Sequence, residues 1–186
     1  MPNHYIMRKY FLILALALFC TGAAAQSYIV SDTTYDTGVR LVKTSSVSLP
    51  NDLGKVDIFF IGAKNDFIKT YAVVIECREC TKAWYLDKGS YLVIDIPEKM
   101  TFAKGNKDIR PKVRYDKEAK KSYFEWVAEF EIPVVDSANL LDNISSLSFQ
   151  LRDSNNLKQQ FNLTIPQETG ETMAKMYYEL MTNVAL

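Results

Sequence analysis

Cys77 and Cys80 are the residues of this 186-residue chain whose spacing is best suited to chemistry. A Cys-x-x-Cys spacing occurs in thiol redox enzymes, in zinc sites and in local disulfides. In redox enzymes the first cysteine begins a helix, where the backbone dipole stabilises the thiolate, whereas here the pair follows a predicted strand, and Glu76 and Glu79 disfavour that anion. A zinc site needs four ligands and would require two chains to meet at this turn. The pattern therefore predicts a local structural disulfide or a reduced pair.

The chain contains one histidine, His4, which falls within a predicted signal peptide. The exported protein would then contain no imidazole. This excludes a Ser-His-Asp or Cys-His nucleophile, a histidine-ligated metal and a histidine proton shuttle. We therefore expect no metal site, no cofactor and no catalytic activity.

Three glutamates, Glu125, Glu129 and Glu131, share one face of a predicted strand. Residues two apart on a strand are separated by roughly 7 Å, which is within the range that inverting glycoside hydrolases use for their two carboxylates. Val127 interrupts the row, and glutamates opposite a core face are ordinarily solvated. A carboxylate-dependent glycoside hydrolase is therefore an alternative to a non-catalytic function.

Basic residues are concentrated between residues 99 and 121, where nine lysines and arginines accompany three acidic residues. From residue 122 onward the balance reverses, with nine acidic residues and three basic ones. The basic segment is expected to be a solvated hairpin, and the alternative is a patch for an anionic glycan, a lipid head group or a protein partner. That patch would consist of Lys104, Lys107, Arg110, Lys112 and Arg114. The balanced charge of the whole chain gives no indication of nucleic-acid binding.

Aromatic residues lie on both sides of a predicted turn at Lys88 and Gly89. Trp84, Tyr85 and Tyr91 are close enough in sequence to form an exposed platform on which a sugar ring would stack. Aromatic side chains are also common in strands because they pack well there. The sequence therefore allows two interpretations, a sugar-binding platform and ordinary packing.

The elements that would position these residues are mainly strands, because apolar and polar residues alternate along most of the chain. Between Tyr123 and Ile132 every even-numbered residue is apolar, while three odd-numbered residues are glutamates. The same alternation on both sides of Asp153–Asn156 predicts an antiparallel hairpin over residues 145–165. Further strands are expected at residues 39–44, 55–62, 67–76, 90–96 and 112–115.

Residues 58–61 are apolar on both faces of their strand, which predicts a central strand that is covered from each side. We therefore expect a mainly β fold in the form of an antiparallel two-layer β-sandwich. Residues 136–142 are expected to form a short connecting helix, because an acidic and a hydroxyl side chain precede two leucines.

The longer helix is expected over residues 167–184, where apolar residues recur at helical spacing. The apolar stripe consists of Met173, Met176, Tyr177, Leu180 and Val184. It should pack on the sandwich, and the alternative is a methionine-rich face for a partner.

Residues 1–25 have the organisation of a signal peptide. Arg8 and Lys9 precede an apolar segment, and Ala23–Ala25 provides the small residues of a cleavage site. Lipidation at Cys20 is the weaker alternative, because the preceding residue is a bulky phenylalanine.

Cleavage after residue 25 of the 186 would leave 161 residues, which is the size of one ordinary domain. We expect residues 26–186 to form that domain. No later segment approaches the roughly 20 apolar residues that cross a bilayer, so we expect no transmembrane segment in it. The protein is expected to be exported to the periplasm, the cell surface or the medium.

Three segments carry a likeness to known proteins. They are Gly38–Ser45, Ala83–Ile94 with its Lys-Gly-Ser step into a strand, and Asp136–Gln150, where a short helix leads into the final hairpin. Together they resemble parts of small secreted β-sandwich proteins of Gram-negative bacteria. The resemblance implies a fold and export, and it implies no functional residue because those proteins have no assigned function.

These observations favour an exported, non-catalytic binding or envelope-associated module. Its partner is expected to be a glycan or another envelope protein. One alternative is the glycoside hydrolase described above. Another is a secreted inhibitor or assembly partner that docks through the C-terminal helix.

Overall fold

The computed structural model describes residues 27–49, 54–81, 83, 85–96, 99–133, 148–152 and 160–185. The predicted signal peptide of residues 1–25 and the predicted short helix of residues 136–142 lie outside the described residues. Both therefore stay predictions.

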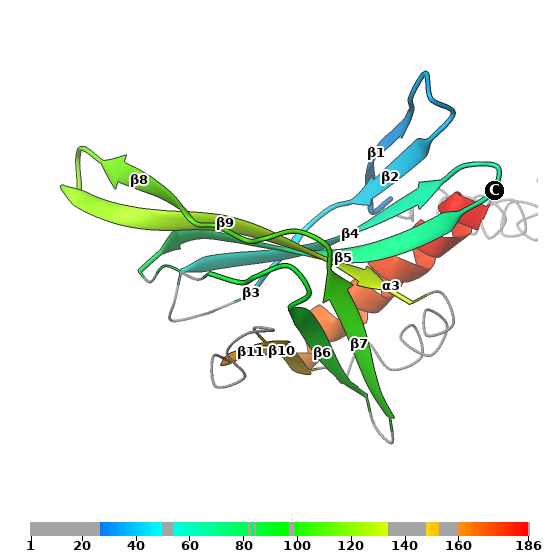
Figure 1. The fold of residues 1–186 in the computed structure, drawn as a ribbon. Coiled ribbons are helices and arrows are strands. Elements are labelled where there is room, and N and C mark those ends of the chain that lie inside the picture. The colour runs from blue at the N-terminus through cyan, green and yellow to red at the C-terminus, as the bar shows by residue number, and fades with distance from the viewer. Residues whose placement is uncertain are drawn as a thin grey trace, which may run out of the picture.

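The described part of the chain is an antiparallel β structure that ends in a helix (Figure 1). Its strands are β1 (Ile29–Thr34), β2 (Arg40–Thr44), β3 (Val47–Leu49), β4 (Lys55–Lys64), β5 (Lys69–Cys80), β6 (Tyr91–Ile96), β7 (Lys99–Gly105), β8 (Lys112–Asp116), β9 (Lys121–Ile132), β10 (Ser148–Arg152) and β11 (Gln160–Thr164). The helix is α3 (Gln167–Ala185). These elements confirm the predicted β-rich fold with a C-terminal helix.

The strands form one hydrogen-bonded sheet in the order β1-β2-β4-β5-β9-β7-β6-β10-β11, with β3 added to β4 and β8 added to β9. β7 pairs with β9 only through Lys104 and Gly105, and otherwise with β6. Past this short contact the sheet changes direction, and β6 and β7 diverge from the long strands β4, β5 and β9 (Figure 1). The expected separation into two layered sheets is not confirmed, because β7 keeps the hydrogen bonding continuous.

Most predicted strands are confirmed, including the hairpin that β10 and β11 form. β1, β3 and β7 were not predicted. β1 is largely polar and exposed, so it lacks the alternation that indicates a half-buried strand. In β7, Met100 and Phe102 do alternate with polar residues, but this signal lies within the basic segment, which was interpreted as a solvated hairpin. β3 is only three residues long.

The core lies on one face of the long strands. Phe60 of β4 is opposite Val73 of β5, which in turn is opposite Phe130 of β9, and all three are fully buried. The neighbouring residues two apart on each strand face the same core. The other face of β4 is covered as well, since Phe59 is almost completely buried and the Lys43 ammonium lies 4.1 Å from the centre of its ring. This confirms the prediction that both faces of this strand are covered.

α3 packs on the core face and confirms the predicted helix. Its whole apolar stripe is buried. Gly62 of β4 permits the close approach, because a Cβ atom there would lie 2.6 Å from Cγ2 of Val184. The ring of Tyr177 lies 5.0 Å from that of Phe60 and 6.0 Å from that of Tyr71. α3 is too polar overall to cross a membrane, and the described residues contain no other helix.

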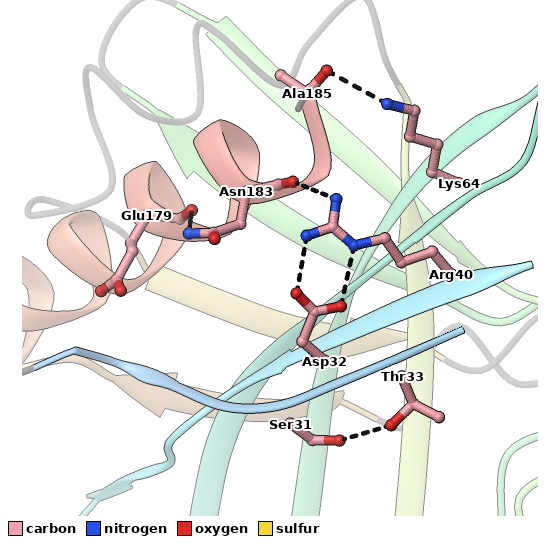
Figure 2. A network of polar contacts seen from close by, with 8 residues as sticks. All are labelled: Ser31, Asp32, Thr33, Arg40, Lys64, Glu179, Asn183 and Ala185. Carbon is pink, nitrogen blue, oxygen red and sulfur yellow. Dashed lines mark hydrogen bonds and ion pairs between the residues drawn. The ribbon is translucent and has the colours of Figure 1, made fainter. Parts of the chain in front are cut away.

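The C-terminal end of α3 is held by side chains from the sheet (Figure 2). The Arg40 guanidinium donates two hydrogen bonds to the Asp32 carboxylate, at 2.9 and 2.7 Å, and a third at 3.0 Å to the carbonyl oxygen of Asn183. Lys64 donates a hydrogen bond to the carbonyl oxygen of Ala185 at 3.3 Å. The last turn of α3 has no basic residue of its own, so these two cations complement the negative end of its dipole.

We predict that Arg40→Ala lowers the midpoint of thermal unfolding by roughly 2 to 4 °C, and that Arg40→Lys restores only part of the loss because a lysine lacks the bidentate geometry. The hydrogen bonds from Arg40 lower the pKa of Asp32. The contribution of the pair is therefore present above about pH 4 and is lost as the pH falls further. Thermal unfolding of both variants between neutral and acidic pH checks this. The hydrogen bond to the Asn183 carbonyl oxygen does not titrate, so part of the difference should remain at low pH. A difference from the unsubstituted protein that is as large at low pH as at neutral pH would contradict the assignment.

Because the hydroxyl of Tyr177 is buried, we predict that the stability of the folded protein depends on pH in the alkaline range. This hydroxyl has no hydrogen-bond partner among the described residues, and burial, followed by the nearby Tyr71, raises the pKa of Tyr177 well above its ordinary value. Above about pH 10 the unfolded chain loses this proton while the folded chain keeps it, so stability falls as the pH rises.

Tyr177→Phe should therefore make this alkaline decline shallower. At neutral pH it should leave the free energy of unfolding unchanged or raise it by about 1 kcal/mol, because an unpaired buried hydroxyl is removed. Denaturant unfolding across the alkaline range is the measurement. Tyr178→Phe, at an exposed position of the same helix, is the control and should keep the original decline.

Candidate functional site

The outward face of β9 carries the predicted carboxylates. Because successive residues of a strand point to opposite faces, burial of Trp126, Ala128 and Phe130 places the odd-numbered residues on the other side. Those residues are Glu125, Val127, Glu129 and Glu131. β9 thus contributes core side chains on one face and mainly charged side chains on the other.

Residues 106–110 form the loop between β7 and β8, which both pair with the same edge of β9, and Asn106 of this loop contacts Glu131 of the outward face. The last part of the loop is fixed by a two-stranded bridge, in which Ile109 donates to the carbonyl oxygen of Leu86 at 2.7 Å and Leu86 donates to that of Ile109 at 3.2 Å. Both side chains are buried in the core. The Asp108 carboxylate also accepts a hydrogen bond from the backbone N–H of Lys88 at 2.7 Å. The loop is therefore anchored at both its backbone and its side chains.

Between this loop and β9 lie two adjoining hollows, of about 380 and about 250 Å³, which share Asp108, Ile109 and Val127. We call them together the β9 trough. The larger hollow is also lined by Glu76, Cys77, Arg110, Lys112, Arg114, Glu125 and Trp126. The smaller one is also lined by Asn106, Lys107, Glu129 and Glu131.

The predicted basic patch is divided by the structure. Arg110, Lys112 and Arg114 line the larger hollow and Lys107 the smaller one, whereas Lys104 lies on β7, opposite Glu131 in the strand register. The trough therefore brings together four of the five predicted cations.

Two of these cations are already paired with carboxylates. Arg110 forms ion pairs with Asp87 at 2.7 Å and with Asp108 at 3.3 Å. Arg114 donates to Glu125 at 2.8 Å, and this hydrogen bond raises the pKa of Arg114 above its ordinary value. The two arginines are thus held in place by charge-assisted hydrogen bonds, which lowers their attraction for a free anion.

The smaller hollow has mainly acidic walls. The Glu131 carboxylate accepts a hydrogen bond from the side-chain amide of Asn106 at 2.9 Å, and Glu129 lies on the same strand face. Among the described residues that line it, Lys107 is the only cation. The β9 trough therefore has a largely cationic wall beside β8 and a largely acidic one beside Glu129 and Glu131, an arrangement suited to a ligand that carries polar groups of both signs.

Three residues of the trough, Glu76, Asp108 and Asn106, were not predicted from the sequence. Glu76 comes from β5 and reaches the trough because β5 and β9 are neighbours in the sheet. Asp108 is an acidic residue within the basic segment of residues 99–121, and its presence there indicates that the charge of the segment is partly neutralised.

Cys77 and Cys80 are joined by a disulfide, with Cα atoms 6.3 Å apart, within the range that disulfides span. Both cysteines are fully buried. They enclose a β-bulge against β9, and Glu79 within it has a left-handed φ of 56°. Gly54 lies against this bulge, where a Cβ atom would be 2.7 Å from the carbonyl oxygen of Arg78. This environment is structural rather than that of an exposed, reactive thiol.

The aromatic platform stays a prediction. Trp84 lies outside the described residues. Tyr85 is exposed next to the bridge at Leu86, and Tyr91 is half-buried at the start of β6.

Within the described residues, no three His, Cys, Asp or Glu side chains gather in a way that would hold a metal ion. Comparisons with protein-family models, with curated proteins and with solved structures find no match to this chain. The resemblance to small secreted β-sandwich proteins therefore remains an expectation.

We predict that a protein lacking residues 1–25 contains no free thiol, so a thiol reagent added after denaturation without reductant should modify neither cysteine. Cys77→Ala/Cys80→Ala should lower the free energy of unfolding by about 2 kcal/mol, the loop-closure contribution of so short a loop. The reduced, unsubstituted protein serves as the comparison and should be destabilised in the same direction. Full labelling of both cysteines, together with a stability that reductant does not change, would contradict this prediction.

Proposed function

We propose that this protein is an exported, non-catalytic binding module of the cell envelope, and that the β9 trough is its ligand-contacting surface. The observation that carries the proposal is the placement of four cationic and five acidic side chains around two adjoining hollows beside β9. Export rests on the predicted signal peptide of residues 1–25.

The chemistry of the trough favours a polar, extended ligand. Val127, which is 55% exposed and lines both hollows, provides a small apolar surface, and the surrounding groups donate and accept hydrogen bonds. Envelope polysaccharides that carry hydroxyl, amino and carboxyl groups match both of its walls. A purely anionic ligand fits less well, because Arg110 and Arg114 are already paired.

Binding is favoured over hydrolysis by the contacts of the glutamates. A glycoside hydrolase needs two carboxyl groups that can act on the bond that is cleaved. Here Glu125 is bound by Arg114 and Glu131 accepts a hydrogen bond from Asn106, so two of the three glutamates are already engaged. Docking through the stripe of α3 is disfavoured for a different reason, since that stripe is buried against the sheet.

We also infer that the bent sheet supplies both layers of the predicted sandwich. Leu92 of β6 and Leu163 of β11 belong to the same buried cluster as Phe60 and Phe130 of the long strands. The two halves of one sheet would then enclose a shared core, as separate sheets do in a sandwich.

The test of the binding proposal is an array of glycans and envelope polysaccharides, probed with the protein lacking residues 1–25 at low and at physiological salt. We expect Lys112→Gln and Glu129→Gln each to weaken binding to a glycan hit by about tenfold, because each would remove a charge-assisted hydrogen bond to the glycan. Matched controls are Lys117→Gln and Glu118→Gln, whose side chains are exposed at the β8–β9 turn and should bind as the unsubstituted protein does.

Binding that neither trough variant changes would contradict the proposed surface. Hydrolysis of a bound glycan that is lost in Glu129→Gln or Glu131→Gln would instead establish the hydrolase alternative.

A further inference from the structure

The hairpin of β8 and β9 projects beyond the rest of the sheet (Figure 1). β8 pairs with β9 along one edge, and no strand of the described residues pairs with its other edge. All five residues of β8 are exposed. An exposed strand edge of this kind offers unpaired backbone N–H and C=O groups to another strand.

The side chains of β8 are complementary to a second copy of the same strand. If two copies pair in antiparallel fashion with Arg114 at the centre, Lys112 of one lies opposite Asp116 of the other. The same register places Val113 opposite the second copy's Tyr115. Opposite charges and aromatic–β-branched pairs are both favourable across neighbouring strands. A two-fold axis generates each of these pairs twice.

The apolar residues of β8 support this pairing. Val113 and Tyr115 are 64% and 61% exposed, and they share a face with Phe124, which is opposite Val113 in the hairpin. Phe124 is half-buried and packs against the core. Pairing of two copies would extend this apolar face across the boundary and cover side chains that are exposed in the single chain.

The central pair would bring two arginines together. Each Arg114 is bound by the Glu125 carboxylate of its own chain at 2.8 Å. The like charges are therefore compensated within each copy before the strands meet. By neutralising Arg114 of its own chain, Glu125 also reduces the repulsion between the two copies.

We propose that two copies of this protein associate through β8, in antiparallel register, to form one continuous sheet across a two-fold axis. β1, at the end of the sheet, is a poorer edge for the same purpose. Its one charged side chain, Asp32, is already bound to Arg40, so self-pairing of β1 offers no complementary charges.

The experiment is sedimentation velocity of the protein lacking residues 1–25 over a series of concentrations. We expect a concentration-dependent dimer. Val113→Lys/Tyr115→Lys would place lysine opposite lysine at two positions and should weaken the dimer about tenfold or more. Val113→Lys/Tyr115→Glu removes the same apolar side chains but would place lysine opposite glutamate, and it should dimerise more strongly than the first variant.

Two controls make the outcome specific. Circular dichroism should show both double variants folded, because the substituted side chains are exposed in the single chain. Val30→Lys, at a position of β1 that is 60% exposed, should leave dimerisation unchanged. The proposal is overturned by a monomer at every concentration up to about 1 mM, by equal dimerisation of the two double variants, or by loss of the dimer in Val30→Lys. Glycan binding to the β9 trough is measured separately, so failure of either proposal leaves the other standing.

Discussion

Burial of the apolar stripe of α3 on the core face of β4 is the interaction on which the rest of this structure depends. The helix approaches closely because Gly62 has no side chain, and Tyr177 fills the space above Phe60 and Tyr71. Once this face of the long strands is covered, their alternate residues must lie on the other side. The alternation of β9 places Trp126, Ala128 and Phe130 on this same core face, so its glutamates lie on the opposite face and line the trough.

Polar contacts also hold α3 against the sheet. Arg40 binds β1 through Asp32 and the end of α3 through Asn183, and the Glu179 carboxylate accepts a hydrogen bond from the backbone N–H of Tyr28 at 2.8 Å. The first strand of the sheet is thus fastened to the last helix at two places. Exposed ion pairs stabilise little individually, and here their importance is that they fix the orientation of α3.

The trough and the free edge of β8 share one structural origin. The loop of residues 106–110 is anchored at Leu86 and then leads into β8, so its cations lie beside the hollow while β8 continues beyond it. Arg114 and Glu125 connect the two regions, since their ion pair lines the larger hollow and also neutralises the centre of β8. A binding surface and an association edge consequently lie side by side on one hairpin.

By itself, the sequence determined which residues of β9 face the core, where α3 lies and which of its residues are buried, because alternation and helical spacing are local properties. It also identified Cys77 with Cys80 and four of the cations that line the trough. Only the tertiary structure decided that the strands form one continuous sheet, that Glu76 and Asp108 join those cations, and that Arg40 meets Asn183, 143 positions further along the chain. Such contacts depend on strand order and register, which follow from packing of the whole chain rather than from the spacing of neighbouring residues.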